Sequence, residues 1–175
     1  VISERVLRTR VNKMNEELTD LVPSLRKFAF SLTGNMHDAD DLLQATVEKL
    51  LSKPLPQEAT LMAWAFRVCR NIWIDEYRAQ KVRTQAAASP ELRAQEQGAL
   101  DTALTSEITL RQVTKAMDHL PNEQRETLSL IAVQGMSYRD ASAVLEVPTG
   151  TIMSRLARAR AKLSNVLRAN NEVLS

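Results

Sequence analysis

The stretch GMSYRDASAVLEVPTGTIMSRLARARAKL, residues 135–163, decides how this chain folds. Ser137 begins a short helix, and Asp140 stands three residues later, where a carboxylate completes a capping box. Pro148 ends that helix, and Thr149 is the expected N-cap of a longer final helix. A short helix, a turn of three or four residues and a longer helix form the helix-turn-helix pattern.

The final expected helix has one apolar and one basic face. Its apolar side chains at helical spacing are Ile152, Leu156, Ala159 and Leu163. The polar and basic side chains that fall roughly opposite are Thr151, Ser154, Arg155, Arg158 and Lys162. No Asp or Glu occurs between Glu146 and Glu172. Such a helix buries one stripe and offers the basic one to the major groove of DNA, although composition alone fits a solvated face equally well.

Helical spacing of apolar residues continues through the N-terminal part of the chain. It predicts helices over residues 16–33, from Asp38 to Pro54, and from Thr60 to about Val82, with Gly34 as the left-handed cap of the first. Aromatic residues make up 4% of the chain, and Gly and Pro number 4 and 6, fewer than strands and tight turns usually require. The sequence therefore predicts an all-α fold.

The helices divide into two small helical domains. Residues 83–98 carry no clear apolar stripe, contain the run AAASP and end in Gly98, which is typical of a linker. The predicted organisation is an N-terminal extension over 1–14, a first domain over 15–82, a linker over 83–98 and a second domain over 99–175.

Composition excludes several classes of protein. A single cysteine, Cys69, rules out an internal disulfide and a multi-cysteine zinc site, and we expect it in the core. With only His37 and His119, clusters of histidine metal ligands are excluded as well. No Ser-His-Asp set and no phosphate-binding Gly loop is present, so we predict no enzyme activity, no cofactor and no metal. No apolar run approaches the length of about 20 residues that spans a bilayer, which favours a cytoplasmic protein.

The third expected helix interleaves cations with aromatic rings. Arg67, Asn71, Asp75 and Arg78 share one face, Arg70, Trp73 and Tyr77 lie on an adjoining face, and Trp64 precedes them by one turn. Because cations contact phosphates and rings stack on unpaired bases, this arrangement suits single-stranded nucleic acid. The alternative is burial of the rings against the first two helices, which is favoured for Trp64 and Phe66 and remains open for Trp73 and Tyr77.

Three acids, Asp38, Asp40 and Asp41, fall in the first turn of the second expected helix. Acids at this place complement the positive end of the helix, which is a stronger explanation than a metal site. A third possibility is a surface that presents carboxylates to a basic protein partner.

The motifs in these segments together resemble those of bacterial RNA polymerase sigma factors of the extracytoplasmic-function type. The segments LTGNMHDADDLLQAT (32–46) and MAWAFRVCRNIWIDEYR (62–78) resemble the second conserved region of that family. The segment LPNEQRETL (120–128) resembles the entry to its fourth region, and residues 135–140 and 147–160 resemble its helix-turn-helix. The resemblance covers roughly residues 16–168, in order and with the expected spacing.

The resemblance implies a transcription initiation factor that binds core RNA polymerase and directs it to promoters. It assigns the polymerase contact to the second helix, with Asp38, Asp41, Leu42 and Gln44. It assigns the melted −10 element to the third helix and the loop before it, with Trp64, Arg67, Arg70, Asn71, Trp73, Tyr77 and Arg78. It assigns the −35 element to the last helix, with Thr149, Thr151, Ser154, Arg155, Arg158 and Lys162. The linker would run toward the RNA exit path, and such factors are commonly inhibited by an anti-sigma factor.

The chain departs from the family pattern at a few positions. Glu146 occupies the turn where Gly is usual, Met153 stands where a basic residue is common, and Ala141-Ser142 replaces a more usual Ile-Ala pair. The glutamate predicts a shifted angle for the last helix.

Three other functions compete with that of a sigma factor. A sigma-like decoy that binds only an anti-sigma factor usually carries a receiver domain, for which 175 residues leave no room. A plain helix-turn-helix regulator would not need the acidic second helix or the aromatic third helix. A helical interaction module would carry its charge incidentally. Against the decoy stand Arg155, expected to point outward and contact bases, and Arg158, expected to contact phosphates.

Overall fold

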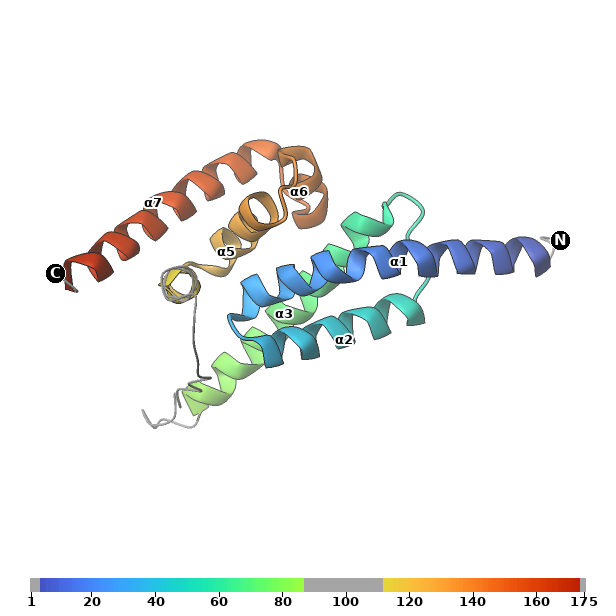
Figure 1. Ribbon diagram of the computed structural model, residues 1–175, viewed down its shortest axis with the longest axis horizontal. Coiled ribbons are helices and arrows are strands. Elements are labelled where there is room, and N and C mark those ends of the chain that lie inside the picture. The colour runs from blue at the N-terminus through green and yellow to red at the C-terminus, as the bar shows by residue number, and fades with distance from the viewer. Residues whose placement is uncertain (1–3, 87–111, 174–175) are drawn as a thin grey trace, which may run out of the picture.

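The structure, a computed structural model, describes residues 4–86 and 112–173, and within these ranges all regular elements are helices (Figure 1). In chain order they are α1 (Glu4–Thr33), α2 (Met36–Ser52), α3 (Leu61–Ala86), α5 (Asn122–Leu128), the π-helix η1 (Ser129–Val133), α6 (Tyr138–Leu145) and α7 (Thr149–Val173). Residues 112–118 are helical too. The predicted all-α fold class is confirmed. Among the described helices, none combines the length and apolar character that crossing a membrane requires.

The helix bounds differ from the predicted ones at several ends. α1 begins at Glu4, twelve residues before the predicted start at residue 16, and α3 continues to Ala86 into the predicted linker. The rest of that linker and the start of the predicted second domain lie outside the described residues. The helix predicted over residues 123–134 is α5 followed by the π turn, in which the N–H of Gln134 donates to the carbonyl of Ser129 at 3.1 Å.

Polar side chains begin three of the helices, as their sequences indicate. Asn35 Oδ1 accepts from the N–H of Asp38 at 2.8 Å before α2, and Thr60 Oγ1 accepts from the N–H of Ala63 at 3.2 Å before α3. Before α6, the predicted capping box forms. Its Ser137 Oγ accepts from the N–H of Asp140 at 3.1 Å and donates to the carboxylate of that residue at 2.7 Å.

The predicted N-cap of the last helix was wrong. Thr149 is the first residue of α7, and the carbonyl of Pro148 accepts from the N–H groups of Thr151 and Ile152 at 2.9 and 3.2 Å. Proline needs no N–H partner of its own and fixes φ near the helical value, so it begins the helix without a side-chain cap.

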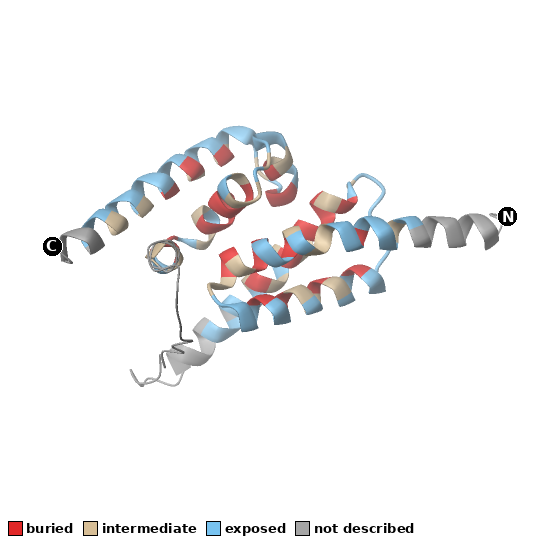
Figure 2. Ribbon diagram, viewed as in Figure 1, coloured by how far each residue is buried: buried red, intermediate tan, exposed pale blue. Residues whose placement is uncertain are grey.

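The helices form two groups that share one apolar core. α1, α2 and α3 pack on one another and form the N-terminal half, whereas residues 112–173 form the C-terminal half (Figure 1). α6 packs on α3, and η1 packs on α1. Five buried residues of the C-terminal half therefore join the core of the N-terminal half (Figure 2): Leu130, Ala141, Val144, Leu145 and Ile152. A second cluster, internal to the C-terminal half, consists of Met117, Leu120, Leu128, Leu156 and Ala159.

Within residues 4–86 and 112–173, the turns between helices use left-handed backbone at three positions. Gly34 has φ +83° and Gly135 has φ +68°, as expected of glycine after a helix. Glu146 adopts the same conformation with φ +56°, and its N–H donates to the carbonyl of Ser142 at the end of α6. The glutamate therefore reproduces the backbone that glycine would supply, at a cost of about 1 kcal/mol. The shifted angle of α7 that we expected from this residue stays a prediction.

We predict that Gly34→Ala lowers the free energy of unfolding by about 1 kcal/mol, because alanine is strained at positive φ. An added Cβ would lie 3.4 Å from Arg125 Nη2, at the edge of ordinary contact, so the backbone sets most of the cost. Gly150→Ala is the matched control, since Gly150 has open space around it and lies in a helix. It should gain up to about 1 kcal/mol. Urea unfolding measures both changes, and equal stability of the two variants contradicts the prediction.

Candidate functional site

An acidic surface covers the beginning of α2. Asp38, Asp41 and Gln44 are exposed there, whereas Leu42 has 0% exposure and packs in the core beneath them. Of the four residues assigned to the polymerase contact, three are thus accessible and Leu42 supports the helix that carries them. Glu76 of α3 lies close enough that its pKa is raised, first by partial burial and then by the charges of Asp38 and Asp41. We call Asp38, Asp41 and Glu76 the acidic surface.

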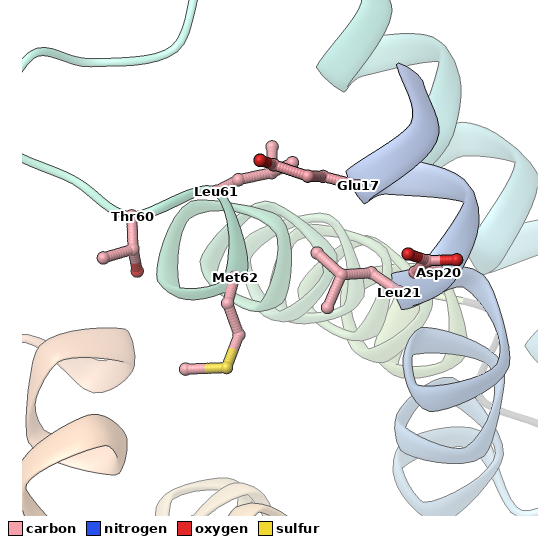
Figure 3. A pocket seen from close by; sticks show the side chains of 6 residues that line it. All are labelled: Glu17, Asp20, Leu21, Thr60, Leu61 and Met62. Carbon is pink, nitrogen blue, oxygen red and sulfur yellow. The ribbon is translucent and has the colours of Figure 1, made fainter. Parts of the chain in front are cut away.

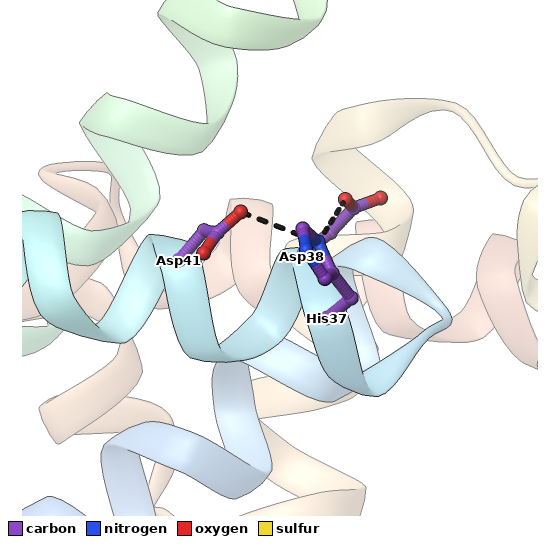
Figure 4. A group of neighbouring side chains, drawn as sticks. All are labelled: His37, Asp38 and Asp41. Carbon is purple, nitrogen blue, oxygen red and sulfur yellow. Dashed lines mark ion pairs between the residues drawn. The ribbon is translucent and has the colours of Figure 1, made fainter.

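Two of the three adjacent aspartates gather around a histidine (Figure 4). His37 Nδ1 lies 3.3 Å from Asp41 Oδ2 and 3.7 Å from Asp38 Oδ1, and all three side chains are exposed. Asp40 points elsewhere and accepts two hydrogen bonds from Arg26 of α1, at 2.6 and 2.9 Å, which lower the pKa of its carboxyl group. Asp40 therefore serves the α1–α2 contact and lies outside the acidic surface.

The side chains of α3 that sequence assigned to the −10 element differ in accessibility. Trp64 and Trp73 are 7% and 6% exposed, so the burial favoured for Trp64 is confirmed and Trp73 joins it in the core. Asn71 is exposed, as is Tyr77, whose ring lies 6.1 Å from that of Trp73. The side chain of Arg78 lies outside the described residues.

Burial of two further side chains of α3 agrees with the sequence. Phe66 is 1% exposed, and its ring centroid lies 5.2 Å from that of Phe28 of α1, with the two rings tilted by 59°. Cys69 is fully buried as expected, and burial raises the pKa of its thiol to about 12. This pKa keeps the thiol protonated and unreactive at neutral pH.

Arg67 of α3 contacts the C-terminal end of α6. Its guanidinium group donates to the carbonyl of Ala143 at 2.6 Å and to that of Val144 at 3.4 Å, and it lies 3.0 Å from Glu146 Oε1. The last carbonyls of a helix have no partner within it and carry partial negative charge, which a guanidinium group neutralises. Arg67 thus links the two halves of the molecule.

A buried carboxylate, Glu126 of α5, lies between two arginines from different halves. Arg70 Nε of α3 donates to Glu126 Oε2 at 2.6 Å, and Arg70 Nη2 donates to Oε1 at 3.2 Å. Arg155 Nη1 of α7 lies 3.6 Å from Glu126 Oε1 and its Nη2 lies 3.2 Å from Glu123 Oε2. Glu126 has 0% exposure, and its hydrogen bonds are the main reason that the pKa of Arg70 is raised.

Sequence reasoning missed Glu126. The signal that could have found it is its position four residues before Leu130, on the face of the chain that turns inward.

Arg125, the neighbour of Glu126, crosses to α1. Its Nε donates to the carbonyl of Ser31 in the last turn of α1 at 2.9 Å, and its Nη1 donates to Asp118 Oδ1 at 2.8 Å. Arg125 is 7% exposed, and this burial lowers its pKa from the usual value. The contact repeats that of Arg67 in the opposite direction, because an arginine of the C-terminal half here neutralises a helix end of the N-terminal half.

The basic face of α7 is open to solvent apart from one residue. Thr149, Ser154, Arg158 and Lys162 are exposed, and Thr151 is partly exposed. The side chain of Arg155 is only 16% exposed and turns toward α5, so the expectation that it points outward was wrong. The reason is its position beside Leu156 in sequence, at the edge of the buried stripe, with two carboxylates in reach.

A shallow pocket of about 340 Å³ lies between α1 and the start of α3 (Figure 3). Leu21, Leu61 and Met62 supply its apolar wall, and Glu17, Asp20 and Thr60 complete the lining. None of the residues assigned above to polymerase or DNA contacts lines it.

Comparison with known proteins gives the same two regions. Residues 18–83 match the family described as Sigma-70 region 2, and residues 110–163 match the family described as Sigma-70, region 4. The chain is 35% identical over 158 residues to the ECF RNA polymerase sigma factor EcfG of Rhodopseudomonas palustris. The aligned segment covers 89% of this chain and 86% of the relative.

Two solved structures resemble the whole arrangement. The sigma factor RpoE from Bartonella quintana, in complex with the anti-sigma factor NepR, superimposes with a TM-score of 0.70 at 32% identity and covers 89% of this chain and 97% of that one. CnrH in complex with the cytosolic domain of CnrY gives a TM-score of 0.66 at 26% identity and covers 89% and 88%. With both regions present in order and a relative matched over nearly its whole length, the chain belongs to the extracytoplasmic-function family of RNA polymerase sigma factors.

Proposed function

We propose that this protein is an alternative sigma factor that binds core RNA polymerase, recognises −10 and −35 promoter DNA and thereby starts transcription. The observation that carries the proposal is the exposed basic face of α7 in the helix-turn-helix, on a chain whose N-terminal half exposes the acidic surface. A cation-rich helix suits DNA, and an acidic surface suits a basic protein. The role requires no catalytic residue, and its place is the cytoplasm, where polymerase works.

The competing functions explain less of the structure. A decoy has no need of the solvent-exposed Arg158 and Lys162, and a plain regulator has no need of the acidic surface. An anti-sigma factor is a further proposed partner, because the relative from Bartonella quintana was solved with one. Reconstitution with core polymerase and a panel of promoters tests the proposal. Specific transcripts that depend on this protein support it, and their absence from every promoter of the panel overturns it.

For the polymerase contact, we predict that Asp41→Arg weakens binding to core polymerase about tenfold or more, because it puts a like charge against a basic partner. Asp41 is exposed and its ion pair is with the exposed His37 of the same helix, so the fold should persist. Glu16→Arg on α1 makes the same charge change outside the acidic surface and should leave binding unchanged. Fluorescence anisotropy with labelled protein measures both affinities, and equal losses would contradict a specific interface.

For the −10 element, we predict that Tyr77→Ala slows open-complex formation about tenfold, because stacking on an unpaired base contributes about 1–3 kcal/mol. Tyr77 is 43% exposed and so can be removed with little loss of core. Tyr138→Ala is the control, since Tyr138 is 41% exposed and belongs to α6, outside the set assigned to the −10 element. Permanganate reactivity of promoter thymines measures the rate. If the two variants open DNA equally fast, Tyr77 has no role in melting.

For the −35 element, we predict that Arg158→Ala weakens binding to all promoter duplexes alike and reduces the salt slope by about one unit, as loss of one phosphate contact does. Arg160→Ala, which removes the same charge from another face of α7, should change the slope less. Titration of holoenzyme against promoter DNA at several salt concentrations separates the two. Identical slopes for both variants would mean that the charge of α7 acts only as general attraction.

A further inference from the structure

The three surfaces assigned to partners are not equally accessible. The acidic surface on α2 and the basic face of α7 are open to solvent. Of the α3 side chains assigned to the −10 element, Arg67 and Arg70 are instead covered by the C-terminal half, because Arg67 contacts the end of α6 and Arg70 contacts Glu126 of α5, whereas Asn71 and Tyr77 stay exposed. The molecule thus covers part of one of its DNA-binding surfaces with another part of itself.

Glu126 has one cationic partner in each half. Its bond to Arg70 joins the two halves, whereas its ion pair with Arg155 lies within the C-terminal half. If the halves separate, Arg70 passes into water or onto a phosphate, and Glu126 keeps Arg155 as a partner. A buried carboxylate that lost its only cation would oppose separation strongly, and the second arginine removes that obstacle.

We propose that this arrangement is a resting state in which α5 and α6 cover Arg67 and Arg70, two cations of the −10-binding face of α3, and that Glu126 is the latch from which Arg70 is released when the halves separate. The proposal rests on the proposed function only for the identity of the covered face. The latch can be tested on the protein by itself, without polymerase or promoter DNA. Substitutions that remove the charge of Glu126 or of Arg70 should shift the molecule toward an open state, in which the two halves are separated.

Energy transfer between two dyes measures the opening directly. We place cysteines at exposed positions outside every proposed binding surface, with Lys49→Cys on α2 and Ser164→Cys on α7. Cys69 does not interfere, because its buried thiol has a pKa of about 12 and resists labelling. Glu126→Gln in this background should lower the transfer efficiency. Glu123→Gln removes an exposed carboxylate whose ion pair is with Arg155 and whose charge acts on Arg70 only at longer range, so it should lower the transfer far less.

Arg70→Gln provides a second route to the same state. It removes the latch from the side of α3 and leaves the Glu126–Arg155 pair intact, so the C-terminal half keeps its internal contacts. It should lower the energy transfer as Glu126→Gln does. Circular dichroism checks that each variant keeps its helices, and if Glu126→Gln does not fold, Arg70→Gln decides the matter.

Binding of single-stranded DNA gives an independent readout. The probe is a labelled 20-nucleotide oligonucleotide of mixed sequence, at low salt. Because apparent affinity scales with the open fraction, a protein that is about one-tenth open can gain at most about tenfold on full opening. Glu126→Gln should bind this probe about threefold to tenfold more tightly than the wild type, and Glu123→Gln, which removes the same charge, should gain far less.

The outcomes separate the latch from the proposed function. Equal energy transfer in the wild type and in folded Glu126→Gln or Arg70→Gln overturns the latch, even if the protein supports transcription with core polymerase. Lower transfer in the latch variants supports it, even if no promoter yields a transcript, in which case the proposed function fails alone. Lower transfer without tighter binding of the oligonucleotide would show that the covered face does not bind DNA and would overturn the masking role.

Discussion

The carboxylate of Glu126 lies where no water reaches it, and the placement of both halves depends on its two cations. Removing one partner from a buried ion pair typically costs about 3–5 kcal/mol, because the remaining charge has nothing to compensate it. Arg70 and Arg155 share this duty from α3 and α7, so one group of atoms fixes a helix of the N-terminal half against two helices of the C-terminal half. The position of α5 follows from this contact, and with it the position of η1, which continues directly from α5, and of α6, which follows after the turn at Gly135.

Two further arginines hold the halves together by the same physical means. Arg67 extends from α3 to the last carbonyls of α6, and Arg125 extends from α5 to a carbonyl in the last turn of α1. Each half therefore supplies a cation to a helix end of the other, where unpaired carbonyls carry partial negative charge. Between these polar contacts, buried residues such as Leu130 and Val144 extend the apolar core of α1 and α3. The cations give the docking its register, and the apolar side chains supply most of its favourable free energy.

The sequence predicted the helices far better than it predicted their docking. Spacing of apolar residues and capping side chains act over a few residues, so the turn at Gly34 and the capping box at Ser137 could be read directly. Contacts between the N-terminal and C-terminal halves leave no such periodic pattern in the sequence. Arg67 and Arg70 resembled a surface for phosphates, and nothing local indicates that they contact a carbonyl 76 residues away and a carboxylate 56 residues away. The prediction for Arg155 was wrong for a related reason. A helical wheel places this residue at the edge of the buried stripe of α7, and only the position of α5 determines whether its side chain faces solvent or the carboxylates of α5.

The kinds of interaction between the two halves suit a protein whose halves separate to bind other partners. The hydrogen bonds of Arg67 and Arg125 end on backbone carbonyls, which water can satisfy after separation, so their loss costs far less than a buried charge left without a partner. Each half also keeps packing of its own, with α1 against α2 and α3 on one side, and Leu128, Leu156 and Ala159 together on the other. Separation therefore exposes the shared apolar residues together with the arginines and the carboxylate of the contact. The apolar residues supply most of the preference for the closed state, and the ionic contacts add to that preference and set which closed state forms.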